Sequence, residues 1–193
     1  MEFNDHYKLS GKHAFLSASK YSWIRYDDEK IYNTYFSAMQ AERGTRLHAV
    51  ACELITLGLK MPKTAQTLNM FVNDALGLHM TPEQILYYSD NAFGTADAIW
   101  FGASPINRGR MLLRIHDLKT GTTKSNINQL EIYAAFFCLE YGYDPSEIDI
   151  ELRIYQNDER MIFIPEPEDI QLIMDKIVRF DQIINKARMG VAL

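Results

Sequence analysis

Residues 83–119 read EQILYYSDNAFGTADAIWFGASPINRGRMLLRIHDLK. Three segments of this stretch are rich in the β-branched and aromatic residues that favour strands, namely 83–89, 93–101 and 110–119. Gly, Pro and Asn residues separate the three segments, as turns between antiparallel strands require. The stretch therefore predicts three consecutive antiparallel strands.

On either side of these strands, the apolar residues return to helical spacing. From about Lys30 to Leu59 they predict a helix that Gly44 breaks into two pieces. Further expected elements are helices at 64–76, 127–141 and 167–189 and a hairpin of strands at 148–156 and 160–164, with its turn at Asn157 and Asp158. This order predicts an α/β or α+β fold, in which helices flank a mixed central sheet of about five strands.

Length and composition bound the class of protein. The chain has 193 residues, of which 47% are hydrophobic and 23% are charged, so a single globular domain over 1–193 is expected. No apolar run is long enough to span a membrane, and the first residues lack the layout of a signal peptide. The two cysteines, Cys52 and Cys138, cannot supply a four-cysteine zinc site or iron–sulfur cluster. Together these features predict a cytoplasmic protein.

The distribution of charge matters more than its total. With 20 Lys+Arg and 25 Asp+Glu, the net charge of −5 taken alone argues against a nucleic-acid partner. However, residues 1–130 hold 14 Lys+Arg and 12 Asp+Glu, a net of +2, whereas residues 131–193 hold 6 and 13, a net of −7. The acidic third is explained equally well by a solvated acidic helix and by an interaction surface. The first 130 residues thus stay compatible with binding a nucleic acid.

The strand at 110–119 ends in a carboxylate and an ammonium group. Because side chains alternate along a strand, Asp117 and Lys119 emerge on the same face. In such a pair the Asp can hold a divalent cation while the Lys steadies an attacking water or a phosphate charge, although an exposed ion pair is the ordinary alternative. Asp97 interrupts an apolar strand, so it is either a turn residue or a buried carboxylate that needs a cation or hydrogen-bond donors. If the two strands are neighbours, Asp97 and Asp117 can share a cation of the Mg²⁺ type.

Two predicted helices add further candidates. His48 can supply a neutral imidazole as a metal ligand, or it is simply a hydrogen-bonded helix histidine. Glu53 lies about 140° around the helix from His48 and is ranked below it as a ligand. Gln129 and Tyr133 are four residues apart, on one helical face, where they can organise a lysine or bind a phosphate. As isolated residues they would be ordinary surface groups.

Taken together, these pieces resemble the PD-(D/E)XK nuclease superfamily, specifically its RecB-type and phage-exonuclease-like branch. The segments that carry the resemblance are, in chain order, GTRLHAVA with His48, GTADAI with Asp97, HDLKTG with Asp117 and Lys119, and NQLEIYA with Gln129 and Tyr133. Their order and their helix or strand contexts agree with that branch over roughly residues 44–133. The resemblance implies a restriction-endonuclease-like fold, with a motif-bearing core at about 44–165 and a C-terminal helix at 167–189.

The resemblance also implies a role for each matching residue. It assigns the binding of Mg²⁺ or Mn²⁺ to His48, Asp97, Asp117 and the backbone carbonyl of Leu118. It assigns activation of water and stabilisation of phosphate charge to Lys119, with Gln129 and Tyr133 supporting the site. Many relatives near this branch hold an iron–sulfur cluster on four cysteines, and none is expected here because the chain has only two.

The sequence therefore predicts a divalent-metal-dependent deoxyribonuclease, an exonuclease serving phage-type recombination, replication or DNA processing. The alternatives are a structure-specific endonuclease and a non-catalytic DNA-binding or regulatory protein of the same fold. Expected partners are DNA, a single-strand annealing protein or helicase, and further copies of the chain. Candidates for contacts with the DNA phosphates are Arg43, Arg46, Lys63, Arg108, Arg110 and Lys124.

Overall fold

The computed structural model describes residues 14–16, 18–121 and 125–189. The chain divides into two compact units, residues 1–43 and 44–193, and each is described by itself. The second unit begins where the motif-bearing core was expected to begin. A single nuclease domain over 1–193 stays a prediction.

The first unit holds a short 3₁₀ helix, η2 (Ala18–Arg25), and the first half of helix α1 (Asp28–Thr56). Asp27 caps α1, because its Oδ1 accepts a hydrogen bond of 2.7 Å from the backbone N–H of Lys30. Asp28 and Glu29 follow in the first turn, where acidic side chains interact favourably with the helix dipole. Local sequence thus accounts for where α1 begins.

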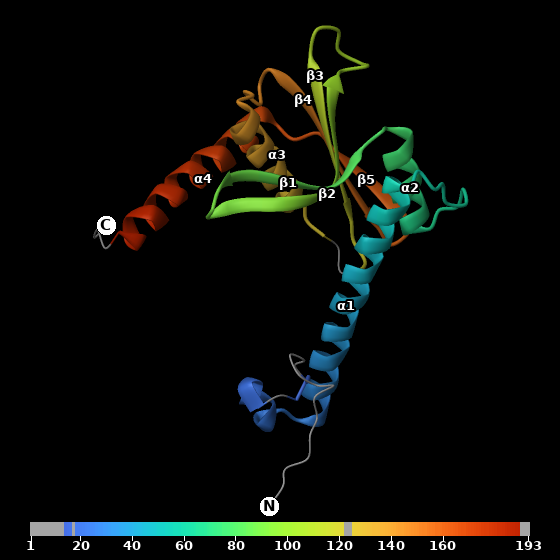
Figure 1. Ribbon diagram of the computed structural model, residues 1–193, viewed down its shortest axis with the longest axis vertical. Coiled ribbons are helices and arrows are strands. Elements are labelled where there is room, and N and C mark those ends of the chain that lie inside the picture. Colours follow the sequence, from blue (N-terminus) through green and yellow to red (C-terminus); the bar gives the residue numbers. More distant parts are fainter. Residues whose placement is uncertain (1–13, 17, 122–124, 190–193) are drawn as a thin grey trace, which may run out of the picture. The chain divides into compact units, whose positions relative to one another are not determined.

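The second unit is built on a five-stranded mixed sheet with the order β1-β2-β3-β4-β5 (Figure 1). The strands are β1 (Thr81–Ser89), β2 (Ala92–Ala103), β3 (Met111–Leu118), β4 (Ile148–Gln156) and β5 (Glu159–Phe163). Among the described residues, β3 and β4 pair in parallel and the other neighbouring strands pair antiparallel. The predicted mixed sheet of an α+β fold is confirmed, with each predicted strand within about two residues of its expected bounds.

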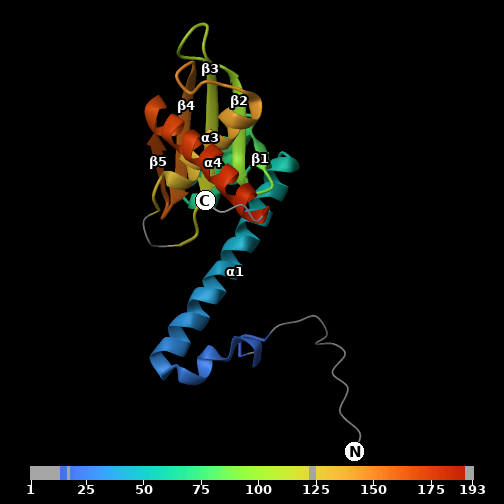
Figure 2. The same ribbon diagram turned by 90° about the vertical axis from the view of Figure 1, so that its left-hand side faces the viewer.

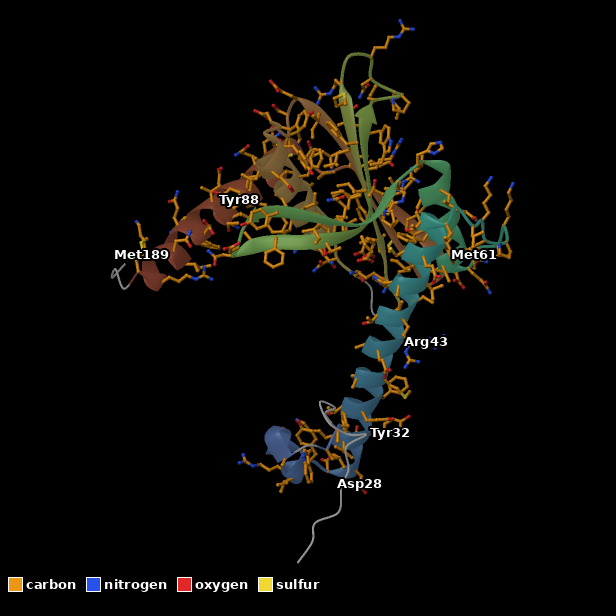
Figure 3. All side chains as sticks on the ribbon, in the orientation of Figure 1. Asp28, Tyr32, Arg43, Met61, Tyr88 and Met189 are labelled. Carbon is orange, nitrogen blue, oxygen red and sulfur yellow. The ribbon has the colours of Figure 1, made fainter. Side chains whose placement is uncertain are left out.

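Helices cover both faces of the sheet. On one face, α3 (Asn128–Tyr141) and α4 (Pro167–Arg188) pack on the sheet through a core that includes Leu113, Phe137 and Ile170. Figure 2 shows these two helices in front of the strands. On the other face, α2 (Thr67–Gly77) and the last turns of α1 bury a second core that includes Ala51 and Phe71. Two side chains labelled in Figure 3 pack against these cores, Tyr88 against the first and Met61 against the second.

Turn and cap residues account for the limits of several elements. Asn157 and Asp158 have φ of 53° and 60° and form the two-residue turn of the β4–β5 hairpin, as predicted. Gly142 ends α3 with a φ of 72°, and its N–H donates a hydrogen bond to the carbonyl of Cys138. Pro167 begins α4, where the N–H that proline lacks has no helical partner.

Gly44 does not break α1, so that prediction is wrong: the helix runs without interruption from Asp28 to Thr56. Gly44 is buried, and a Cβ added to it would lie only 2.8 Å from Oγ1 of Thr120, just after β3. The glycine therefore permits a close approach between α1 and the end of β3. Its cost within a helix, about 1 kcal/mol relative to alanine, is too small to interrupt a helix that is packed on the sheet.

No helix in the described part of the chain has the length and hydrophobicity that crossing a membrane requires.

Candidate active site

The end of β3, the central strand of the sheet, carries the predicted Asp117. Ala98 of β2 pairs with His116 of β3, so Asp97 and Asp117 stand opposite each other one position further along the two strands. The sequence left their proximity conditional on β2 and β3 being neighbours, and the strand order meets that condition.

Asp97 connects the end of β3 to α1. Its Oδ2 accepts a hydrogen bond of 2.8 Å from the backbone N–H of Leu118. Its Oδ1 lies 3.2 Å from Nδ1 of His48. This hydrogen bond raises the pKa of His48, although burial of the imidazole acts in the opposite direction. The structure thus brings the side chains of His48 and Asp97 and the backbone N–H of Leu118 together, whereas the resemblance assigns metal binding to the carbonyl of Leu118.

Asp117 is almost fully buried, with 2% of its side chain exposed. Its Oδ1 lies 3.1 Å from Nζ of Lys119, whereas its Oδ2 has no hydrogen-bond partner among the described residues. Burial, together with the nearby charge of Asp97, raises the pKa of Asp117 to about 6. A buried carboxylate oxygen without a partner is costly, and a bound cation would satisfy it. The residues present therefore fit a divalent ion.

Lys119 is held between β3 and α3. Its Nζ donates a hydrogen bond of 2.6 Å to Oε1 of Gln129, and Nε2 of Gln129 donates one of 2.9 Å to the hydroxyl of Tyr133. Gly94 of β2 makes room for the tyrosine, because a Cβ there would lie 2.8 Å from Cε1 of Tyr133. A continuous chain of polar contacts thus runs from Asp117 through Lys119 and Gln129 to Tyr133.

The loop after β3 is held by a residue that the sequence did not single out. The buried Gln156, at the end of β4, donates a hydrogen bond of 2.6 Å to the carbonyl of Gly121 and accepts one of 3.1 Å from the N–H of Ser125. The backbone N–H of Lys119 also donates to the carbonyl of Tyr155, at 2.9 Å. Strand β4 therefore helps to fix the direction in which Lys119 leaves the sheet.

A third carboxylate, from Glu83 of β1, joins the site. Single ligand atoms of His48, Glu83 and Asp97 all lie within 4.8 Å of one another, and Asp117 is not part of this group. Burial and the charge of Asp97 raise the pKa of Glu83. Sequence reasoning missed this residue because it lies at the start of a strand and in no recognised motif. Hairpin pairing about the turn at 90–91 is the signal that could have placed it opposite Asp97.

His48, Glu83 and Asp97 line an open hollow of about 740 Å³ beside the second half of α1. Glu53 lines the same hollow but does not belong to the group of three ligand atoms. Because the hollow is open to solvent, a polymer can approach the carboxylates without entering a closed cavity.

Two of the predicted phosphate-binding residues lie far from this site. Arg108 and Arg110 lie between β2 and β3, at the opposite end of β3 from Asp117, about 20 Å of strand away. The antiparallel β2–β3 hairpin places its turn, and these two arginines, at the end of the strands remote from Asp117. The guanidinium of Arg110 is also engaged, since its Nε lies 2.7 Å from Oδ1 of Asp149.

The remaining basic candidates are distributed over both units. Arg46 is exposed on α1, two residues before His48, and Lys63 is exposed between α1 and α2. Arg43 is exposed in the first unit, and Lys124 lies outside the described residues. Of this set, Arg46 is the nearest in sequence to a site residue.

Comparisons with family models, with curated proteins and with solved structures give no significant match to this chain. The class of protein therefore has to be inferred from the fold and from the chemistry of the site.

Proposed function

We propose that the chain is a divalent-metal-dependent DNA nuclease of the PD-(D/E)XK type, an exonuclease that hydrolyses phosphodiester bonds in phage-type recombination, replication or DNA processing in the cytoplasm. The observation that carries the proposal is the Asp117–Lys119 pair, with 3.1 Å between its charged atoms, at the end of the central strand and opposite Asp97. Oδ2 of Asp117 is buried at this point with no hydrogen-bond partner in the described part of the chain, which favours a bound cation.

Asp97 and Asp117 would hold Mg²⁺ or Mn²⁺, with His48 and the carbonyl of Leu118 beside them. A divalent ion bound there would act as a Lewis acid on the phosphate and favour deprotonation of a water molecule. The two carboxylates would also set the orientation in which the phosphodiester approaches. Both carboxyl groups must be ionised for this role. Because the pKa of Asp117 is raised to about 6, its ionisation requires a bound cation or a pH above about 6.

Lys119 would present its ammonium group to the attacking water or to a phosphate oxygen. Two of its three protons face Oδ1 of Asp117 and Oε1 of Gln129, which leaves one for the substrate. Tyr133 acts through Gln129, since it accepts the amide proton and so limits the orientations of the side chain that holds the lysine. A preorganised positive charge of this kind is among the larger contributions to phosphoryl-transfer rates.

Two alternatives make different predictions. A structure-specific endonuclease would cut covalently closed circular DNA as well as linear DNA. A non-catalytic DNA-binding or regulatory protein would bind DNA without degrading it. A single-strand annealing protein, a helicase or further copies of the chain are proposed as partners.

The test is incubation of linear duplex and closed circular plasmid with Mg²⁺, with Mn²⁺ and with EDTA. We expect metal-dependent loss of the linear DNA, with the circle spared. Asp117→Ala and Lys119→Ala should each lower the rate by about 100-fold or more. Arg179→Ala, an exposed residue of α4 outside every proposed contact, is the control and should keep the wild-type rate.

Wild-type cleavage by Lys119→Ala would contradict the assigned site. A gel shift without metal-dependent degradation would favour the non-catalytic alternative, and cutting of the closed circle would favour the endonuclease.

A further inference from the structure

Glu83 has an unusual backbone conformation at its position opposite Asp97. Its φ is +49°, in the left-handed region that residues other than glycine seldom occupy. The β1–β2 ladder is regular at Pro82–Ala98 and at Gln84–Ala96, and Glu83 lies between these pairs, opposite Asp97. The distortion is therefore located where the two carboxylates face each other across the strands.

The arrangement concentrates negative charge unless a cation is bound. Carboxylates at directly opposite positions of neighbouring strands repel each other. The ligand atoms of His48, Glu83 and Asp97 lie within 4.8 Å of one another, and ligands of one ion, at about 2.0–2.6 Å from it, lie at most about 5 Å apart. A single ion can therefore contact all three side chains.

An independent observation also points to a cation. Oδ2 of Asp117 is buried without a hydrogen-bond partner among the described residues, and this carboxylate interacts electrostatically with Asp97. Asp97 thus has one acidic neighbour on β1, Glu83, and another on β3, Asp117, of which only Oδ1 is paired with Lys119 among the described residues. A positive charge beside Asp97 would reduce its electrostatic repulsion with both of these carboxylates.

We infer that Glu83 is a protein ligand of the divalent cation, together with His48 and Asp97, and that this set selects Mn²⁺ over Mg²⁺. Two carboxylates suit either ion, whereas an imidazole nitrogen is a better ligand for Mn²⁺ than for the harder Mg²⁺. The inference rests on the proposed function only because it places the cation at the same site. It assigns metal binding to Glu83, a residue outside the sequence motifs that resemble the nuclease superfamily.

The experiment is a titration of the full chain with Mn²⁺ in the absence of DNA, in which free Mn²⁺ is measured by its electron paramagnetic resonance signal. Glu83→Gln should weaken Mn²⁺ binding at least tenfold. Glu53→Gln is the matched control, because Glu53 lines the same hollow without joining the group, and it should bind within twofold of wild type. Competition with Mg²⁺ should show that wild type prefers Mn²⁺.

Wild-type Mn²⁺ affinity in Glu83→Gln, with its circular dichroism spectrum unchanged, would overturn the inference. Should that variant fail to fold, Glu83→Asp keeps the charge and shortens the side chain. Weakened binding by this variant supports the ligand role, and unchanged binding overturns it.

Measuring DNA hydrolysis separately keeps the two proposals apart. If Lys119→Ala loses hydrolysis while Glu83→Gln keeps full Mn²⁺ affinity, the nuclease proposal stands and the ligand role of Glu83 fails. If Mn²⁺ affinity depends on Glu83 but wild type hydrolyses no DNA, the ligand role stands and the nuclease proposal fails.

Discussion

Replacing Asp117 by Asn should stabilise the metal-free protein at neutral and alkaline pH. Burial and the charge of Asp97 raise the pKa of this carboxyl from its ordinary 3.8 to about 6. That difference spans roughly two pH units at about 1.4 kcal/mol each, so ionising Asp117 costs the folded state about 3 kcal/mol. Asparagine has nearly the same shape, and its amide oxygen can still accept a hydrogen bond from Lys119.

The sign of the pH dependence follows from the folded pKa lying above the unfolded one. The folded state favours the protonated acid, so this contribution to stability is full below pH 3.8 and is lost as the pH rises through about 6. Relative to wild type, Asp117→Asn should therefore gain about 3 kcal/mol at pH 8 and less than about 1 kcal/mol at pH 4.

Urea unfolding in the presence of EDTA at pH 8, 6 and 4 measures this difference. Saturating Mn²⁺ should narrow the gap at pH 8, because a cation offsets the charge of Asp117 in wild type only. Glu53→Gln, on the exposed side of α1, is the control and should stay within about 0.5 kcal/mol of wild type at every pH. A variant no more stable than wild type at pH 8, or a gain that persists unchanged at pH 4, would refute the reasoning.

Two further predictions concern the support of Lys119. Gly94→Ala would place a Cβ 2.8 Å from the ring of Tyr133, so thermal or urea unfolding should show a loss of about 1–3 kcal/mol, and an unchanged stability would contradict this contact. Tyr133→Phe removes the hydroxyl that accepts from Gln129, so kcat for DNA hydrolysis should fall about 2- to 10-fold while the fold, checked by circular dichroism, is kept. A fall as large as that of Lys119→Ala would instead indicate that Tyr133 acts on the substrate directly.

Much of the architecture was predictable because it depends on spacing along the chain. Alternation and helical periodicity located the five strands and the helices, and turn residues such as Asn157 and Gly142 marked their limits. The same local geometry set Asp117 beside Lys119, which directly follows the end of β3, and Gln129 beside Tyr133, four residues on in a helix. The prediction that Gly44 breaks the helix was wrong because the role of this glycine depends on Thr120, a residue remote in sequence that packs against it.

By itself, then, the sequence determined which elements form and which neighbouring side chains share a face, since both follow from backbone geometry over a few residues. Only the tertiary structure brought His48 to Glu83 and Asp97, because the packing of α1 against the β1–β2 hairpin depends on contacts between segments that are distant in the sequence. The tertiary structure also buried Oδ2 of Asp117 with no hydrogen-bond partner among residues 14–16, 18–121 and 125–189, since burial depends on the central position of β3 between β2 and β4.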